Sequence, residues 1–337
     1  MKVLYVGQYS QGTTSRMRGE SLNAILNPSL FEIIDTHVPF YNTSRIFRTL
    51  GFRYKTGPLI HHTNTHILKQ LNKGQYDLIW VDKAVYITPS TTAILRSHTS
   101  KMVHFTPDPA FTFHQSQHFY KSLPYYTDVI TTKSYELDAY LKICQSAQVL
   151  YATQGFDAKL HQPSELPFNT KKGFVFIGHH ETGREKILDL LLRHHIPITL
   201  AGIKWESFAR RHINNPHLTF LGNGIFGEDY VKAIQSAKIA WGAISKWVPE
   251  LHTTRTFEIP ACGTALLTER NKETQLFFHE DEAIFYDSEG EIAEKVLHYL
   301  NNDVELEKLT ERGHSRVWDH GYDYFSILTQ LLAKILK

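Results

Sequence analysis

The stretch GFVFIGHHETGREKILDLLLRHHIPITLA, residues 173–201, has the pattern of one strand–helix–strand unit. Two short apolar runs, Gly173–Ile177 and Ile198–Ala201, flank the segment Arg184–His194, which has apolar residues at helical spacing. Several runs of this kind in the chain are continuously apolar, which is typical of parallel strands covered by helices on both faces. The stretch therefore predicts a βαβ unit and a parallel sheet.

The same alternation extends outward from this unit over the whole chain. Further strands are expected at Lys2–Val6, Phe31–His37, Asp77–Val81, Met102–Phe105, Asp128–Thr132, Gln148–Ala152, Leu218–Leu221, Lys238–Trp241, Ala265–Thr268 and Ala283–Tyr286. Further helices are expected at Ser15–Leu26, His62–Leu71, Glu228–Ser236, Thr253–Ala261, Glu289–Leu300 and Tyr324–Leu336. The pattern predicts an α/β protein of two Rossmann-like domains with doubly wound parallel sheets, facing a shared cleft where ligands bind.

The boundary between the two halves lies where the periodicity stops. After Gly155–Asp157 the chain carries Pro163, Pro167 and the polar run Asn169–Gly173, which are turn residues without an apolar face. We therefore predict an N-terminal domain over residues 1–160 and a C-terminal domain over residues 170–320. The last helix, residues 322–337, is expected to pack back onto the N-terminal domain.

The composition argues against several classes of protein. With 36 Lys and Arg against 34 Asp and Glu, the formal charge is only +2, so no nucleic-acid partner is expected. The two cysteines, Cys144 and Cys262, provide neither a disulfide framework nor a Cys-based zinc site. No apolar run approaches the roughly 20 residues of a membrane span, and we expect a cytoplasmic protein without a transmembrane segment. The 20 histidines form no metal-ligand motif and no Asp-x-Asp occurs, so neither a metal nor another cofactor is expected.

The most informative motif is ELHTTRTFE, residues 250–258, in which seven residues separate Glu250 from Glu258. A helix that begins near Thr253 would direct N–H groups and partial positive charge at a diphosphate. Arg255 in its first turn would contact phosphate oxygens. The carboxylate of Glu258 suits the vicinal diol of a ribose, and that of Glu250 suits a sugar hydroxyl. The alternative is an ordinary helix whose glutamates lie on a solvated face.

This motif and its surroundings resemble the CgeB-like (spore maturation protein) family of GT-B glycosyltransferases. The similarity lies within about residues 173–325, and its most characteristic part is Arg255–Gly263 with Leu266–Glu269. Further matching segments are Phe176–Gly178 with Arg184-Glu185, Leu221-Gly222 with the helix of Tyr230, and Asp319-His320. Leu251-His252 departs from the larger relatives, which carry Phe-Gly there. The resemblance implies metal-independent transfer of a sugar from a nucleoside-diphosphate donor, most commonly a UDP-sugar, to an acceptor hydroxyl. The spacing of the two glutamates resembles that of retaining enzymes.

The resemblance also implies a donor site on the loops that follow the strands of the C-terminal domain. Each of these residues also has an alternative role that involves no donor. The glycines would only serve turn geometry, Arg184 and Lys204 would be solvated surface residues, and Phe226 would pack in the core. The implied donor-binding residues are Gly178, Arg184, Lys204, Gly224, Ile225, Phe226, His252, Thr253, Thr254, Arg255 and Glu258.

The acceptor side is expected in the N-terminal domain. Its polar loop between the first strand and the first helix would face the acceptor through Gln11, Gly12, Thr13 and Arg16. The candidate catalytic residues are Asp108, His104 and Glu250, since a carboxylate or imidazole near an acceptor hydroxyl acts as a base. For Asp108 the alternative is turn formation between two prolines. The acceptor, whether a glycan, a protein or a small molecule, is not identified by the sequence.

Two other classes of protein share this fold and its phosphate chemistry. A nucleotide-sugar epimerase or hydrolase would act on the donor without an acceptor. A non-catalytic binding protein would bind the nucleotide sugar without turnover.

Overall fold

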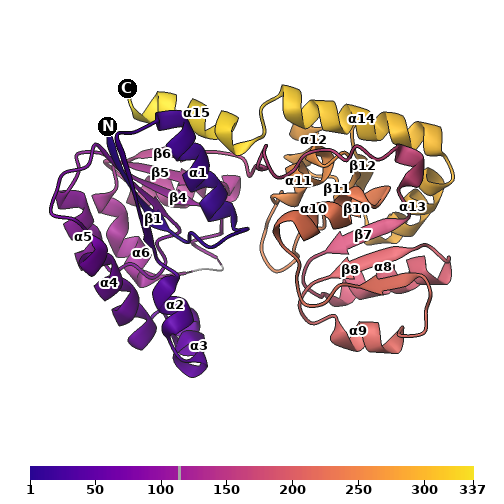
Figure 1. Cartoon of the computed structure of the whole chain (residues 1–337), viewed down its shortest axis with the longest axis horizontal. Helices are drawn as coiled ribbons and strands as arrows, with labels where there is room; N and C mark the ends of the chain where they lie inside the picture. Colours follow the sequence, from indigo (N-terminus) through magenta and orange to yellow (C-terminus); the bar gives the residue numbers. More distant parts are fainter. Residues whose placement is uncertain (113–114) are drawn as a thin grey trace. The chain divides into compact units, whose positions relative to one another are not determined.

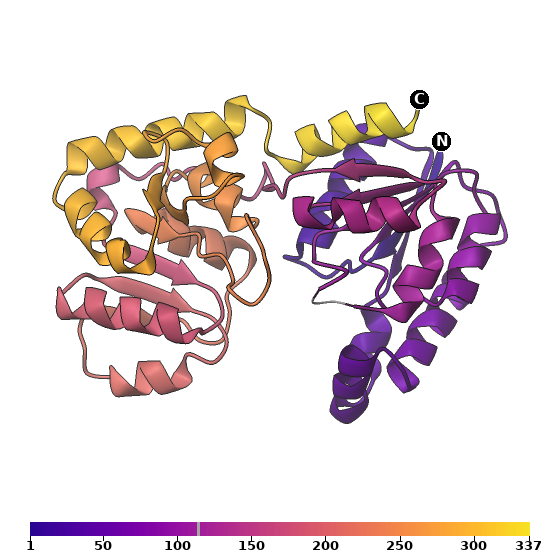
Figure 2. The same cartoon turned by 180° about the vertical axis from the view of Figure 1, so that it is seen from behind.

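The computed structural model describes residues 1–112 and 115–337, which form two α/β units (Figure 1). Unit 1 contains Met1–Thr153 together with Tyr324–Lys337, and unit 2 contains Gln154–Asp323. Each unit has a six-stranded sheet in which the paired strands are parallel. Figures 1 and 2 show helices on both faces of each sheet. The predicted fold class, two Rossmann-like doubly wound units, is therefore confirmed.

Unit 1 has the strand order β2-β1-β3-β4-β5-β6. Its strands are β1 (Lys2–Gly7), β2 (Leu30–Asp35), β3 (Leu78–Asp82), β4 (Met102–Thr106), β5 (Asp128–Thr131) and β6 (Gln148–Tyr151). Its helices are α1 (Thr14–Leu26), α2 (Val38–Asn42), α3 (Arg45–Tyr54), α4 (Pro58–Gln70), α5 (Pro89–Ser97), α6 (Gln117–Ser122), α7 (Leu137–Ile143) and α15 (Tyr324–Ile335), with 3-10 turns at Leu123–Tyr125 and Ser134–Glu136. Strands β3, β4 and β5 are buried along their whole length, as expected for strands covered on both faces.

Unit 2 has the strand order β12-β11-β10-β7-β8-β9. Its strands are β7 (Phe174–Ile177), β8 (Ile198–Ala201), β9 (Leu218–Phe220), β10 (Ile239–Trp241), β11 (Ala265–Glu269) and β12 (Ile284–Tyr286). Its helices are α8 (Thr182–Arg193), α9 (Glu206–Arg211), α10 (Gly227–Gln235), α11 (Arg255–Ala261), α12 (Thr274–Phe277), α13 (Ile292–Leu300) and α14 (Asp303–Asp319), with 3-10 turns at Phe168–Thr170 and Glu289–Glu291.

Each sheet has one point at which the direction of the strand order reverses. In unit 2 the chain runs outward from β7 through β8 to β9, returns to β10 beside β7, and continues through β11 to β12. Unit 1 has the corresponding point between β1 and β3. Ligands of open α/β sheets bind outside the carboxyl ends of the strands at such points. These two places are therefore where a functional site is expected.

The twelve predicted strands are all present with ends shifted by at most two residues, and the seven predicted helices are present with shifts of up to four. Other helices were missed, and the 17-residue α14 is the longest of them. Only a narrow stripe of α14 is buried, because five of its residues face the core. A stripe this narrow within a strongly charged segment gives a weak periodic signal.

Helix α15 packs against α1 in unit 1. Its buried face includes Ile327, Leu328 and Leu331. The last segment of the chain thus completes the layer that covers one face of the unit 1 sheet. No helix within the described ranges has the length and apolar character needed to span a membrane.

Replacing Leu328 with alanine is expected to lower the free energy of unfolding of unit 1 by roughly 2–5 kcal/mol, because it leaves a cavity in a packed interface. The Leu328 side chain is fully buried, whereas Leu336 near the end of the chain is exposed. Urea denaturation followed by circular dichroism measures the change, and Leu336→Ala serves as the control, with an expected change within about 0.5 kcal/mol. Equal losses in both variants would contradict the docking of α15.

Candidate functional site

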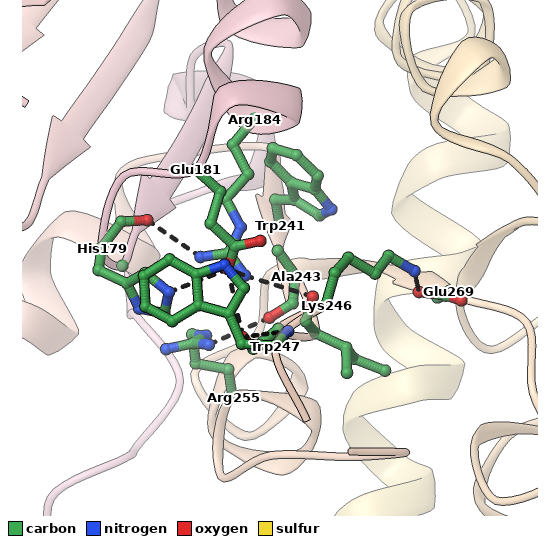
Figure 3. Close-up of polar contacts among 12 residues, drawn as sticks. His179, Glu181, Arg184, Trp241, Ala243, Lys246, Trp247, Arg255 and Glu269 are labelled. Carbon is green, nitrogen blue, oxygen red and sulfur yellow. Dashed lines mark hydrogen bonds and ion pairs between the residues drawn. The ribbon is translucent and has the colours of Figure 1, made fainter. Parts of the chain in front are cut away.

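A group of polar and aromatic side chains gathers where β7 and β10 end in unit 2 (Figure 3). His179, Glu181 and Arg184 follow β7, while Ser245 and Trp247 follow β10. Neighbouring parallel strands end at the same edge of a sheet, and β7 pairs directly with β10. These residues and Arg255 of α11, here called the switch-point cluster, therefore lie at the place where the fold predicts a ligand.

The loops after β7 and β8 approach each other closely at Gly202. Its φ is +141°, and a Cβ there would lie 1.9 Å from the carbonyl oxygen of Gly178, so only glycine fits. The indole Nε1 of Trp205 donates to the same Gly178 carbonyl at 2.8 Å. A Cβ at Gly178 would meet the Phe176 ring at 2.8 Å. Close packing between the loops therefore explains why glycine stands at positions 178 and 202, and the predicted donor contact of Gly178 stays a prediction.

Arg184 joins the loops after β7 and β10. Its guanidinium donates to the carbonyl oxygens of His179 at 3.0 Å and Ile244 at 3.3 Å, and it forms an ion pair of 2.7 Å with Glu181 (Figure 3). Burial lowers the pKa of Arg184, the carboxylate of Glu181 opposes this, and the nearby charge of Arg255 adds to the lowering. The side chain is only 3% exposed. Both terminal guanidinium nitrogens of Arg184 thus bind protein oxygens, which favours a positioning role, and the predicted phosphate contact stays a prediction.

Glu181 and His179 extend this network toward the exposed Trp247. The Glu181 carboxylate accepts a hydrogen bond from Ser245 Oγ at 3.3 Å and lies 2.9 Å from His179 Nε2. The His179 ring lies 5.3 Å from the Trp247 ring, centroid to centroid. Burial, and then the charge of Arg184, lower the pKa of His179, while the Glu181 carboxylate opposes this effect. The sequence analysis missed Glu181 and Trp247, although both follow predicted strands at the switch point.

Arg255 is the cation of the cluster with an unused donor. One of its guanidinium nitrogens donates to the carbonyl oxygen of Ala243 at 3.1 Å. Its Nε is buried, and nothing in the described part of the chain accepts a hydrogen bond from it. A buried donor without a partner costs free energy, and an anionic ligand would satisfy it.

Lys204 adds a further positive charge near the same place. Its Nζ lies 6.0 Å from the centroid of the Trp247 ring, and its φ of +67° holds the backbone in the left-handed region. Three positive charges lie here, those of Arg184, Arg255 and Lys204. They outnumber the two carboxylates that act on Arg184, which belong to Glu181 and Glu289. An excess of positive charge at the switch point suits a phosphate-bearing ligand.

Helix α11 begins two residues later than predicted, and its first turn uses its own donors. The Thr253 N–H donates to Thr256 Oγ1 at 3.1 Å, and the N–H groups of Thr256 and Phe257 donate to the carbonyls of Thr253 and Thr254. Thr253 Oγ1 is buried without a hydrogen-bond partner among the described residues. The predicted diphosphate contacts of Thr253, Thr254 and this helix terminus stay predictions, and the unused Nε of Arg255 lies in the same turn.

His252 does not face a ligand, which corrects another prediction. Its ring is 1% exposed and packs against the rings of Phe257 and Phe277. The Gln154 N–H donates to Nε2 at 3.0 Å, which fixes the proton on Nδ1, 2.6 Å from a Glu273 carboxylate oxygen. His252 is therefore a structural residue of the unit 2 interior.

Glu258 is enclosed as well. Its carboxylate accepts a hydrogen bond of 2.6 Å from the Tyr230 hydroxyl and lies 3.8 Å from His161 Nε2. The residue is 6% exposed. The alternative of a solvated glutamate is therefore wrong for Glu258. The predicted ribose contact stays a prediction, since the carboxylate has further acceptor sites beside the one that Tyr230 occupies.

The remaining donor-side predictions lie on other loops. Gly224, Ile225 and Phe226 follow β9, an edge strand two positions from β7. Phe226 is 75% exposed, so the alternative that it packs in the core is wrong. Glu250 precedes α11 and is partly exposed. Their donor contacts stay predictions.

In unit 1 the strongest polar contact at the carboxyl edge is the ion pair between Arg18 and Asp82. Both side chains are 1% exposed, and Arg18 Nε lies 2.8 Å from the carboxylate. The guanidinium also stacks 4.6 Å from the Phe105 ring and 5.5 Å from the Tyr324 ring. Burial lowers the pKa of Arg18, but the Asp82 carboxylate outweighs this effect and raises it. The sequence analysis missed this pair, although Asp82 directly follows a predicted strand and Arg18 lies on a predicted helix.

The predicted acceptor-side residues lie around this edge. Asp108 is partly exposed and forms an ion pair with Lys83. Thr13 caps α1 by accepting a hydrogen bond from the Arg16 N–H at 3.4 Å, and Arg16 pairs with Glu20. Gln11 is exposed, and Gly12 has a φ of +77°. Helix capping explains the side chain of Thr13. The predicted contacts of these residues with the acceptor stay predictions.

His104 is not a catalytic residue in this structure, which corrects the prediction. It is 1% exposed within β4, and its ring lies 4.7 Å from that of Phe119 and 5.1 Å from that of Tyr126. Its Nε2 accepts a hydrogen bond from the Ala84 N–H at 3.3 Å. Burial lowers the pKa of His104 to about 3. A neutral imidazole inside the core cannot reach an acceptor hydroxyl.

The free energy of unfolding is expected to fall as the pH drops from about 6.5 toward 3, by up to about 1.4 kcal/mol per pH unit. The native pKa of His104 lies below its unfolded value, so the unfolded chain binds the proton first and the contribution of His104 is complete only above pH 6.5. Chemical denaturation at a series of pH values measures the slope. His104→Asn removes this titration, and an unchanged slope in that variant would contradict the assignment.

Two Rossmann-like units in one chain, with the last helix returning to the first unit, define the GT-B fold. Residues 184–333 match the family model described as glycosyl transferase-like. The chain therefore has the GT-B fold and contains a glycosyltransferase-like domain over these residues. A search of curated proteins finds no significant match.

Solved structures of other proteins share this fold over the full length of the chain. The structure of Anabaena Alr3699/HepE in complex with UDP has a TM-score of 0.64 at 14% sequence identity and covers 100% of both chains. The complex of the same protein with UDP-glucose has a TM-score of 0.64 at 14% identity and covers 100% of this chain and 99% of that one. The α,α-trehalose 6-phosphate synthase of Burkholderia multivorans has a TM-score of 0.64 at 9% identity and covers 100% and 96%. At these identities the similarity shows the fold alone.

Proposed function

We propose that this protein transfers a sugar from a nucleoside-diphosphate donor, a UDP-sugar in the first instance, to an acceptor hydroxyl without a metal ion. The observation that carries the proposal is the position of Arg255, whose buried Nε lacks a partner among the described residues beside the switch point of unit 2. The glycosyl transferase-like family match includes this residue. A diphosphate oxygen would supply the missing acceptor.

Sugar transfer requires stabilisation of the diphosphate that leaves. Arg255 and Lys204 would neutralise its negative charge, and the buried Arg184–Glu181 pair would keep the loops around them in place. Cations that are already positioned do not have to reorganise during the reaction, which makes them effective. The exposed Trp247 ring offers an apolar face beside them for the base or the sugar.

The choice of UDP and of the CgeB-like branch is also part of the proposal. Proteins with this fold have been solved with UDP and with UDP-glucose, and the motif Arg255–Gly263 resembles the CgeB-like signature. Calorimetry with UDP, GDP, ADP and their glucose conjugates tests the choice. Binding of the uridine compounds alone supports it, and preference for another base would replace UDP as the nucleotide.

Donor turnover separates sugar transfer from its alternatives. Incubation of the protein and the bound donor with candidate acceptors should form a glycosylated product, while the donor alone should stay largely intact. Epimer formation or free sugar from the donor alone would favour an epimerase or hydrolase. Binding without turnover under every acceptor condition would favour a non-catalytic binding protein.

The stereochemical outcome tests the assignment of the catalytic residues. Retention is proposed from the spacing of Glu250 and Glu258, and product anomer analysis by NMR measures it. An inverted product would discard retention and favour Asp108 as the base, since inversion needs a group that accepts the acceptor proton.

A further inference from the structure

The charges of the chain are divided unequally between its two units. Unit 1 contains 17 Lys and Arg against 9 Asp and Glu, and unit 2 contains 19 against 25. Formal charges of +8 and −6 thus underlie the total of +2. The segment between Asp35 and Asp77 contributes most to this difference, because it has six Lys and Arg and no acidic residue.

This segment includes α2 and α3, which project beyond the carboxyl ends of the strands of unit 1 in both views (Figures 1 and 2). At 3.6 residues per turn, Ile46, Phe47, Leu50 and Tyr54 gather on one apolar face of α3. Arg45 and Arg48 lie on the opposite face on either side of the exposed Phe52, and Arg53 borders the apolar face next to Ile46. All four apolar side chains are classed among the exposed large hydrophobic residues, and Ile46 is 71% exposed.

Helix α3 contacts the rest of unit 1 through a small area. Gly51 is its only buried residue, and a Cβ there would lie 2.6 Å from Leu59 Cβ of α4. Helix α3 therefore contacts α4 at Gly51, and its apolar side chains stay exposed. The arginines are not neutralised either, since no ion pair of the described residues includes Arg45, Arg48 or Arg53. Arg48 and Arg53 lie against the Phe40 and Tyr54 rings instead.

We propose that α3 docks unit 1 onto a membrane surface that contains anionic lipids. Ile46, Phe47 and Leu50 would enter the region between headgroups and acyl chains, while the arginines would contact lipid phosphates. A projecting helix inserts into a soft surface, whereas a peptide or helix partner generally occupies a groove. The absence of acidic residues from the whole segment matches an anionic surface. This proposal does not depend on the proposed sugar transfer.

Cosedimentation of the full chain with vesicles tests the proposal. Vesicles of phosphatidylcholine with about one-third phosphatidylglycerol should bind the protein at low salt and release it as salt increases. Vesicles of phosphatidylcholine alone should bind much less. Equal binding to both, or no binding to either, would overturn the proposal.

Two variants separate the apolar and the electrostatic contributions. The variant Arg45→Gln/Arg48→Gln/Arg53→Gln should bind anionic vesicles about 100-fold more weakly, since each basic residue contributes about fivefold. The variant Ile46→Ser/Phe47→Ser should also lose binding and should melt at the wild-type temperature, because both side chains are exposed.

The matched control is Ile213→Ser/Leu276→Ser in unit 2, where the side chains are 76% and 73% exposed. Vesicle binding of this variant should be unchanged, and a loss equal to that of the α3 variant would overturn the assignment to α3. Light scattering without vesicles adds a second readout. A wild-type dimer that dissociates in Ile46→Ser/Phe47→Ser, together with absent vesicle binding, would assign α3 to contact between copies and overturn membrane docking.

Discussion

Substituting alanine for Arg255 should weaken binding of UDP by about 10- to 100-fold, because a charge-assisted hydrogen bond to phosphate is lost. The fold should be retained, since the side chain makes a single described hydrogen bond, to the Ala243 carbonyl. Isothermal titration calorimetry measures the affinity, and a thermal melt checks the fold.

Two further variants sharpen this experiment. Arg255→Lys keeps the charge but loses the planar fork, so its affinity should fall between those of the wild type and the alanine variant. Arg312→Ala is the matched control, because Arg312 forms an exposed ion pair with Asp281 in the same unit. Undiminished UDP binding by Arg255→Ala would place the diphosphate elsewhere.

Replacing Arg184 with methionine should lower the free energy of unfolding of unit 2 by up to about 3 kcal/mol, because the largely enclosed carboxylate of Glu181 loses its guanidinium partner and keeps only Ser245 and His179. The loss should exceed that of any single exposed ion pair, since Arg184 also holds the carbonyls of His179 and Ile244. Urea denaturation followed by tryptophan fluorescence measures it, and four of the five tryptophans lie in unit 2.

The double variant Glu181→Gln/Arg184→Met tests the cause of this loss. Neutralising the carboxylate should restore part of the stability, so the two substitutions should be strongly non-additive. A loss of unfolding free energy below about 1 kcal/mol for Arg184→Met would show that this side chain does not hold the loops after β7 and β10 together.

The two units differ in how their candidate sites are assembled. In unit 2 the switch point has an excess of positive charge and a donor on Arg255 that the described residues do not satisfy. In unit 1 the Nη1 of Arg18 also lacks a described partner, but both side chains of the Arg18–Asp82 pair are 1% exposed, whereas Arg255 is partly exposed. This difference supports a donor site on unit 2 and agrees with an acceptor role for unit 1.

The strands were predictable because continuous apolar runs of four to six residues, repeated between amphipathic helices, leave few arrangements other than parallel sheets. The sequence also identified the region of the candidate site, since the residues after β7 and around Arg255 lie at the carboxyl edge of the sheet. Helix α3 was missed although Ile46, Phe47, Leu50 and Tyr54 have helical spacing. It has ten residues with a glycine at position 51, and such a short segment gives a weak helical signal.

The sequence by itself determined the architecture and the chemical character of the chain, because periodicity and composition depend only on the order of the residues. Only the tertiary structure decided which polar side chains are available to a ligand. His104, His252 and Arg184 have residue types suited to catalysis or phosphate binding, but each is enclosed by partners distant in the sequence. Arg255 keeps an unused donor because no acceptor in the described chain reaches its Nε. Burial and hydrogen bonding depend on contacts between separate segments, and those contacts exist only once the chain has folded.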